Sequence, residues 1–179
     1  MGFTLICMKN EKNNGIESDF IEIKKLVYDP CDIQCCAIIK EIENADYGAY
    51  AFEVNGLSVK FRVAKITPTK KGQFVTLYKR IEDGSIAPYD VSDNIDLFVV
   101  SVKNNDLLGQ FVFPKSALLE KDILTANGKG GKRALRVYPS WEKNLNQQAQ
   151  KTQEWQLNYF MQINLDTMYC DQIKKLYLQ

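Results

Sequence analysis

The dipeptide Asn55-Gly56 lies between two runs that alternate apolar and polar residues, AYAFEV before it and LSVKFRV after it. Asn-Gly readily adopts the two positive φ angles of a two-residue type I′ turn, which joins adjacent antiparallel strands. The sequence therefore predicts an antiparallel hairpin at this point.

The alternation in the second strand assigns its residues to two faces. Odd positions from Leu57 to Val63 are apolar and share one face, while even positions, including Lys60 and Arg62, share a polar face. Lys65 then falls on the apolar side. Unless a bulge resets the register, its ammonium group lies at the end of a buried face, which is costly without an anionic partner. We therefore expect Lys65 to face an anion in a recess.

Further strands and helices follow from the apolar patterns along the chain. The predicted strands are 73–80, 97–102, 107–113 and 134–138. The predicted helices are 17–28, 117–122, 145–163 and 170–178. Residues 67–72 are predicted to form a loop, and Gly109 to mark a bulge or a close backbone approach. These elements predict one domain over 1–179, irregular over 1–15, with an α/β or α+β fold whose mixed sheet is flanked by helices.

Histidine is absent, and the cysteines are odd in number: Cys7, Cys31, Cys35, Cys36 and Cys170. The lack of histidine excludes Ser-His-Asp and Cys-His catalysis and every His-ligated metal. Because disulfide frameworks are usually even and spread out, we expect reduced, buried thiols rather than disulfides or zinc. Cys36 is expected in the core with its neighbours at 37–39.

No apolar run approaches the roughly 18 residues needed to cross a bilayer, and the first residues lack the features of a signal peptide. We therefore expect a cytoplasmic protein that does not associate with a membrane.

Basic residues are concentrated between Lys60 and Arg80, a stretch with seven Lys or Arg and no Asp or Glu in a chain of net charge +1. Since these residues are threaded through predicted strands, their charge should be displayed on an ordered surface that suits a polyanion. The alternative is that each is an ordinary solvated charge.

Several separate blocks, in the same order along the chain, resemble the MepB family of small bacterial proteins. The blocks are FRVAKITPTKKGQFVTLYKR, PYDVSDNIDLFVV, GQFVFPKSALLEKDIL, GKRALRVYPSW and QAQKTQEWQLNYF, within 47–163. The resemblance implies a fold like that of restriction endonucleases, the PD-(D/E)xK architecture, and nucleic-acid binding.

Nucleases of that architecture hold Mg²⁺ with carboxylates beside the scissile phosphate and place a Lys near the attacking water. Asp93 and Asp96 are the candidate ligands for Mg²⁺ or Mn²⁺, and Lys65, Lys79 and Asp96 are the candidate catalytic residues. The E-x-K pattern is missing from the strand that ends at Lys103. The acidic segment 88–96 is more simply explained as a solvated loop that caps and ends strands.

Three functions remain open. The leading prediction is DNA binding by a nuclease-like fold that is divergent in, or lacks, the catalytic motif, through Arg62, Lys65, Lys70, Lys79, Arg80, Arg133 and Arg136. The alternatives are a metal-dependent nuclease and an interaction module whose basic groove receives an acidic protein or a small anion. Tyr138, Trp141 and Trp155 are expected to pack in the core rather than to stack on bases.

Overall fold

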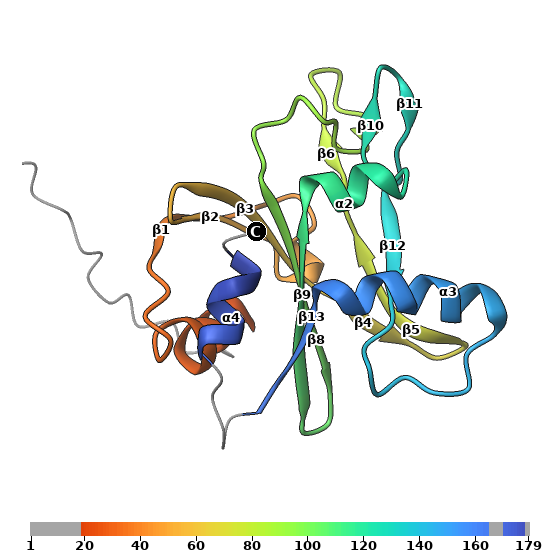
Figure 1. Cartoon of the computed structure of the whole chain (residues 1–179). Helices are drawn as coiled ribbons and strands as arrows, with labels where there is room; N and C mark the ends of the chain where they lie inside the picture. The colour runs from red at the N-terminus through yellow and green to blue at the C-terminus, as the bar shows by residue number, and fades with distance from the viewer. Residues whose placement is uncertain (1–18, 165–169, 178–179) are drawn as a thin grey trace, which may run out of the picture.

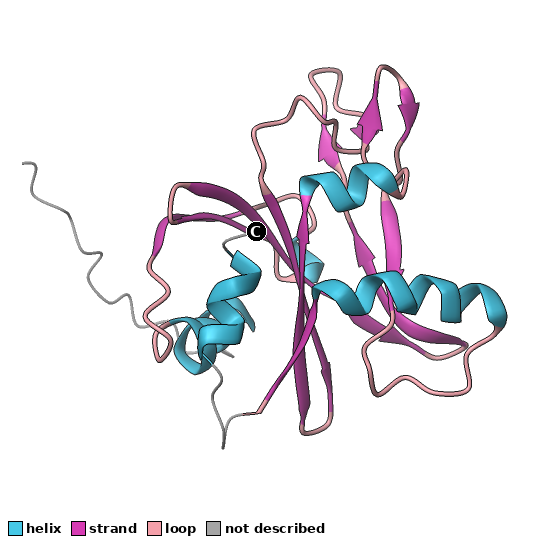
Figure 2. Ribbon diagram, in the orientation of Figure 1, coloured by secondary structure: helices cyan, strands magenta, loops and turns pink. Residues whose placement is uncertain are grey.

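The computed structural model of the protein describes residues 19–164 and 170–177. A six-stranded sheet forms its centre, and it is mixed, as predicted: β3 and β8 are parallel, and the other neighbours are antiparallel (Figures 1 and 2). In spatial order the strands are β1 (Cys35–Lys40), β2 (Tyr50–Val54), β3 (Leu57–Val63), β8 (Leu97–Asn104), β9 (Leu107–Pro114) and β13 (Phe160–Ile163). The predicted hairpin is confirmed, because Val54 pairs with Leu57 across the Asn55-Gly56 turn.

The central sheet separates two apolar cores, because side chains of a strand point alternately to opposite faces. On β8, Leu97 and Val99 face one core, and Phe98 and Val100 face the other. The apolar run at 97–102 is therefore buried on both faces, as a central strand should be. Helical segments cover the first core: α1 (Asp19–Ile23), the π-helix η1 (Lys24–Tyr28) and α4 (Cys170–Tyr177).

A second sheet covers the other core, together with α2 (Lys115–Glu120). This sheet is antiparallel and three-stranded, in the order β12 (Ala134–Val137), β5 (Lys70–Thr76) and β4 (Lys65–Thr67). Helix α3 (Gln147–Gln156) packs beside β12 (Figure 1). The smaller elements are η2 (Ala45–Tyr47), β6 (Lys79–Arg80), β7 (Ile86–Ala87), β10 (Thr125–Ala126), β11 (Lys129–Gly130) and η3 (Leu157–Tyr159).

The prediction that Lys65 ends a buried face is wrong, because β3 ends at Val63 and the alternation of faces ends with it. The chain passes from the central sheet into the second sheet at Ala64, whose N–H donates to the Ser101 carbonyl oxygen at 2.9 Å. Lys65 opens β4, is exposed, and places Nζ 4.8 Å from the centre of the Tyr47 ring. The loop predicted over 67–72 is shorter than expected, since β5 already begins at Lys70.

The long helix predicted over 145–163 ends early. Helix α3 stops at Gln156, a short 3₁₀ turn follows, and Phe160 begins the edge strand β13. Phe160 pairs with Phe111 of β9, and its ring covers Gly109, where an added Cβ would lie 2.6 Å from the ring. The prediction that Gly109 marks a close approach is therefore confirmed.

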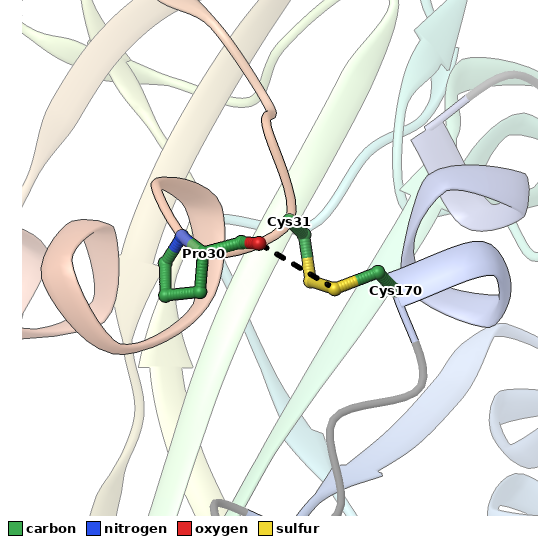
Figure 3. The surroundings of a disulfide bond; sticks show 3 residues. All are labelled: Pro30, Cys31 and Cys170. Atoms are coloured by element: carbon green, nitrogen blue, oxygen red, sulfur yellow. Dashed lines mark hydrogen bonds between the residues drawn. A yellow bond between two sulfur atoms is a disulfide. The ribbon is translucent and has the colours of Figure 1, made fainter.

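Two of the cysteines form a disulfide, so the prediction of reduced thiols is wrong for Cys31 and Cys170 (Figure 3). They are 139 residues apart in sequence, yet their Cα atoms lie 5.0 Å apart. Cys35 and Cys36 are free, and Cys7 lies outside the described residues. The expectation that Cys36 and residues 37–39 are core is also wrong, because β1 is an edge strand and these residues are exposed.

None of the helices in the described part of the chain is both long and apolar enough to cross a membrane.

Candidate nucleic-acid interface

The carboxylates of the two candidate metal ligands, Asp93 and Asp96, accept hydrogen bonds from backbone N–H groups. Asp96 Oδ2 accepts the Ser58 N–H at 2.8 Å, and the Asp96 N–H donates to the Ser58 carbonyl oxygen at 2.8 Å. Asp93 Oδ2 accepts the Asp90 N–H at 2.7 Å, while Oδ1 forms an ion pair with Lys79. Among the described residues, no group of three or more His, Cys, Asp or Glu is placed to hold a metal ion.

Asp90 is likewise engaged within its own segment. Its carboxylate accepts hydrogen bonds from the Ser92 hydroxyl at 2.6 Å and from the Thr125 hydroxyl at 2.6 Å. These hydrogen bonds lower the pKa of Asp90 to about 2, since they favour the charged form. The acidic segment thus has the strand-ending role that is its simpler interpretation from the sequence.

Most of the basic stretch from Lys60 to Arg80 is paired with carboxylates. Lys60 and Arg62 both pair with Glu41, and Arg80 Nε lies 2.8 Å from Glu43 Oε1. Their charges are therefore largely compensated.

Arg62 is fully buried, so the expectation that it shares an exposed polar face is wrong. It pairs with Val100 across the parallel strands and so points into the core beneath the second sheet. There Nη1 lies 2.6 Å from Glu41 Oε2 and 2.8 Å from the Phe61 carbonyl oxygen, and Nη2 donates to the Tyr89 hydroxyl at 3.2 Å. Burial raises the pKa of that hydroxyl to about 12, although the nearby Arg62 acts in the opposite direction.

Positive charge collects instead in a cavity of about 800 Å³ between the second sheet, α2 and α3, which we call the basic groove. Its residues include five cations, and no Asp or Glu among the described residues lines it. One of the five, Lys121, forms an ion pair with Glu120 outside the lining, with Nζ 2.8 Å from Oε1. The cations are Lys70, Lys71, Lys121, Lys132 and Arg136. An anion in the groove would meet no like charge on its walls.

Arg136 is held in place on the sheet side of this groove. Nη1 donates to the Gly72 carbonyl oxygen at 3.2 Å, and Nη2 to Thr67 Oγ1 at 2.8 Å. The guanidinium also lies 5.7 Å from the centre of the Phe74 ring. Because all these partners are neutral, Arg136 keeps its full charge for a ligand.

Gln156 joins the helix side of the groove to the sheet side. Its side chain is buried, its Nε2 donates to the Arg136 carbonyl oxygen at 2.9 Å, and its Oε1 accepts the Tyr138 N–H at 2.9 Å. One carboxamide thus satisfies two backbone groups of β12 and the residue after it.

Aromatic and amide side chains complete the lining. Trp155 packs against the core beneath the second sheet, as expected, and its half-buried side chain also lines the groove. Tyr138 is half-buried and lines the groove as well. Trp141 does pack inside, with its ring 5.6 Å from that of Phe160. Asn146 caps α3 by accepting the Ala149 N–H at 2.9 Å, and it lines the groove with Asn144 and Gln148.

The groove unites part of the predicted binding set. Lys70 and Arg136 line it, whereas Lys65 and Arg133 are exposed outside its lining and the other three predicted residues, Arg62, Lys79 and Arg80, are paired with acids. Sequence reasoning missed Lys121 and Lys132 as site residues. The basic run GKGGKR contains Lys132 and could have indicated it, whereas nothing around Lys121 distinguishes it.

Comparison with known proteins agrees with the fold. The family model described as MepB-like matches residues 41–162, a range that contains the whole groove. A solved structure described as the crystal structure of MepB is similar, at 36% sequence identity and a TM-score of 0.73, covering 83% of this chain and 99% of that one. No curated protein matches the chain. The chain therefore belongs to the MepB-like family.

Proposed function

We propose that this protein binds nucleic acid through the basic groove, on a fold that resembles restriction endonucleases. The observation that supports this proposal is the lining itself: five cations from three stretches of the chain, 70–71, 121 and 132–136, and no carboxylate among the described residues, in a chain of net charge +1. Three of these cations, Lys70, Lys71 and Lys132, are exposed and have no ion-pair partner in the described part of the chain. Such charges bind phosphates by releasing counterions.

Salt dependence tests the proposal. We expect a fluorescently labelled oligonucleotide to bind at low salt, with an affinity that falls linearly with salt concentration on logarithmic axes. Replacing Lys70 or Lys132 by Gln should weaken binding to all sequences similarly and reduce the slope by about 1. Lys151→Gln is the matched control, because Lys151 is exposed on α3 but does not line the groove.

The contrary result is equally clear. If neither duplex nor single-stranded nucleic acid binds at low salt, or if Lys151→Gln weakens binding as much as Lys70→Gln, the groove is not a nucleic-acid site.

A small phosphorylated anion is a second candidate ligand, and the size of the cavity favours it. About 800 Å³ lies within the range of roughly 300–1,000 Å³ typical of small-molecule sites. Competition separates the two candidates: a mononucleotide that displaces the labelled strand as effectively as an unlabelled strand does would favour the small ligand.

We also propose that this binding takes place in the cytoplasm.

Cleavage of nucleic acid with Mg²⁺ or Mn²⁺ stays a prediction. Digestion assays with wild type and Asp96→Asn test cleavage. Metal-dependent cleavage by wild type that is lost in the variant would support Asp96 as a ligand, and equal cleavage by both would refute that role.

A further inference from the structure

Helix α4 is joined to the first core by the Cys31–Cys170 disulfide (Figure 3). Cys170 is the first residue of α4, and Cys31 lies in the turn that follows η1. Cys31 is itself a member of the first core, with an exposed fraction of 1%. The bond therefore fixes the N-terminal end of α4 on the core that this helix covers.

The noncovalent contacts of α4 come from one side of a short helix. Of its eight residues, Ile173 and Tyr177 are buried, and Leu176 packs against the same core in part. The Tyr177 hydroxyl lies 2.8 Å from the Tyr28 hydroxyl oxygen and donates to Gln110 Oε1 at 3.2 Å. Gln110 Nε2 donates to the Tyr28 hydroxyl at 3.0 Å, so the three groups satisfy one another in a buried site.

A helix of eight residues depends on this docking for its form. Isolated helices shorter than roughly 12–15 residues are marginal in water, and tertiary packing of an apolar face supplies most of their stability. Undocking and unwinding of α4 are therefore one event. A covalent bond at its first residue opposes that event, because it makes docking intramolecular over a very short tether.

We propose that the Cys31–Cys170 disulfide is a redox switch. In the oxidised chain it holds α4 on the first core, and its reduction by a dithiol releases α4 while the central sheet stays folded. This inference goes beyond nucleic-acid binding and does not rest on it.

The remaining cysteines of the described chain indicate a reducing environment. Cys36 is exposed and free, and Cys35 is half-buried and free. An exposed free thiol fits a compartment that keeps thiols reduced, and a disulfide in such a compartment is usually transient and redox-sensing. This agrees with the cytoplasmic location proposed above.

The exposures of the two bonded cysteines set the order of the exchange. Cys170 is half-buried and Cys31 is almost fully buried, so a thiolate of the dithiol attacks Cys170 Sγ. The bond between the two Sγ atoms breaks, a mixed disulfide forms on Cys170, and Cys31 leaves as a thiolate that takes up a proton. The second thiol of the reductant then attacks the reductant sulfur in the mixed disulfide and frees Cys170. The dithiol loses two electrons and two protons, which end on the two cysteine thiols.

Cys35 is four residues after Cys31 but is not the attacking group. Burial raises the pKa of its thiol to about 12, so it holds little thiolate near neutral pH. The proposal therefore assigns the attack to a dithiol from outside the chain.

The test follows amide hydrogen exchange by mass spectrometry on the full chain, oxidised and then reduced with dithiothreitol. In the reduced protein we expect the amides of α4 to exchange faster by roughly 100-fold or more, the scale on which a tether shifts an intramolecular equilibrium. Amides of β8 and β9 should stay protected. Removal of dithiothreitol and reoxidation should restore the protection of α4.

Two variants complete the comparison. Cys170→Ser lacks the bond, so its α4 amides should exchange at the fast rate with and without dithiothreitol. Cys36→Ser is the matched control, because Cys36 lies on the edge strand β1 and takes no part in the bond, and it should respond to dithiothreitol as wild type does.

Three results would overturn the proposal. The first is a bond that is absent from the oxidised protein, or that dithiothreitol cleaves only after denaturation. The second is a reduced protein whose α4 amides are as protected as in the oxidised one. The third is loss of protection in β8 and β9 together with α4, which is global unfolding rather than a switch. None of these results affects the nucleic-acid proposal, because the experiment contains no oligonucleotide.

Discussion

Replacing Glu41 by Ala should strongly destabilise the fold, because it leaves the buried Arg62 charge without its carboxylate. Arg62 is 0% exposed, and Glu41 is its ion-pair partner among the described residues, at 2.6 Å. The remaining partners of Arg62 are neutral: the Phe61 carbonyl oxygen and the Tyr89 hydroxyl. An uncompensated buried charge of this kind costs about 3–5 kcal/mol.

The lower end of that range applies here, because the Glu41 side chain is 17% exposed and water can reach the gap that it leaves. A loss of about 3 kcal/mol, at roughly 2–4 °C per kcal/mol for a chain of this size, lowers Tm by roughly 6–12 °C. Thermal unfolding followed by circular dichroism measures this shift, and urea unfolding measures the free energy.

A double variant isolates the charge from the packing. Glu41→Ala with Arg62→Met removes both charges and keeps a long apolar side chain in the core, so it should be more stable than Glu41→Ala alone. Glu43→Ala is the control, because it breaks the exposed ion pair with Arg80 and should change Tm little. The reasoning is refuted if Glu41→Ala shifts Tm no more than Glu43→Ala does.

Three further predictions concern other contacts. Asp96→Ala should lower the free energy of unfolding by about 1 kcal/mol in urea, with Asp96→Asn affected less, because the carboxylate accepts the Ser58 N–H; equal loss in both variants would contradict this role. Breaking the Cys31–Cys170 disulfide should cost roughly 2–5 kcal/mol, since it closes a loop of 139 residues. Reductant should then lower Tm of wild type and not of Cys170→Ser, and an unchanged wild-type Tm would count against the bond. The pKa of Asp90 is lowered from 3.8 to about 2, so its stabilising contribution is present above about pH 4 and is lost as the pH falls through 2. Asp90→Asn should lack that part of the pH dependence of the urea midpoint, and a profile identical to wild type would exclude Asp90 as its source.

The elements that the sequence predicted well are those specified by local chemistry. Asn55-Gly56 determined the turn and register of β2 and β3, and the apolar run at 97–102 indicated a strand buried on both faces. Gly109 indicated a close approach without naming Phe160 as its partner. In each case the information lies within a few residues of the feature.

The errors arose where a distant segment decides the environment. Alternation placed Arg62 on the even face of β3 correctly, but it could not reveal that a second sheet covers that face. The spacing of Phe160 fits an apolar helical stripe in the sequence, but in the structure Phe160 pairs with Phe111 of β9 and belongs to a strand. Cys31 and Cys170 meet only because α4 packs against the turn after η1.

The candidate site shows the same division. Charge counting located Lys70 and its neighbours, but a count does not reveal which basic residues have carboxylate partners. Lys79 and Arg80 lie in the same stretch and are paired with Asp93 and Glu43. Lys121 directly follows α2 and lines the groove together with Lys70, although the two residues are far apart in the sequence.

The carboxamide of Gln156 fixes the distance between α3 and β12, and with it the width of the groove. Since it bonds to backbone atoms on both sides of Val137, helix α3 cannot swing away from β12 without breaking both hydrogen bonds inside a buried environment. The two walls of the groove formed by α3 and β12 are therefore expected to stay at a fixed separation rather than to close on a ligand. A flexible ligand must bear the ordering cost of association, so affinity should rise when the ligand is already extended in solution.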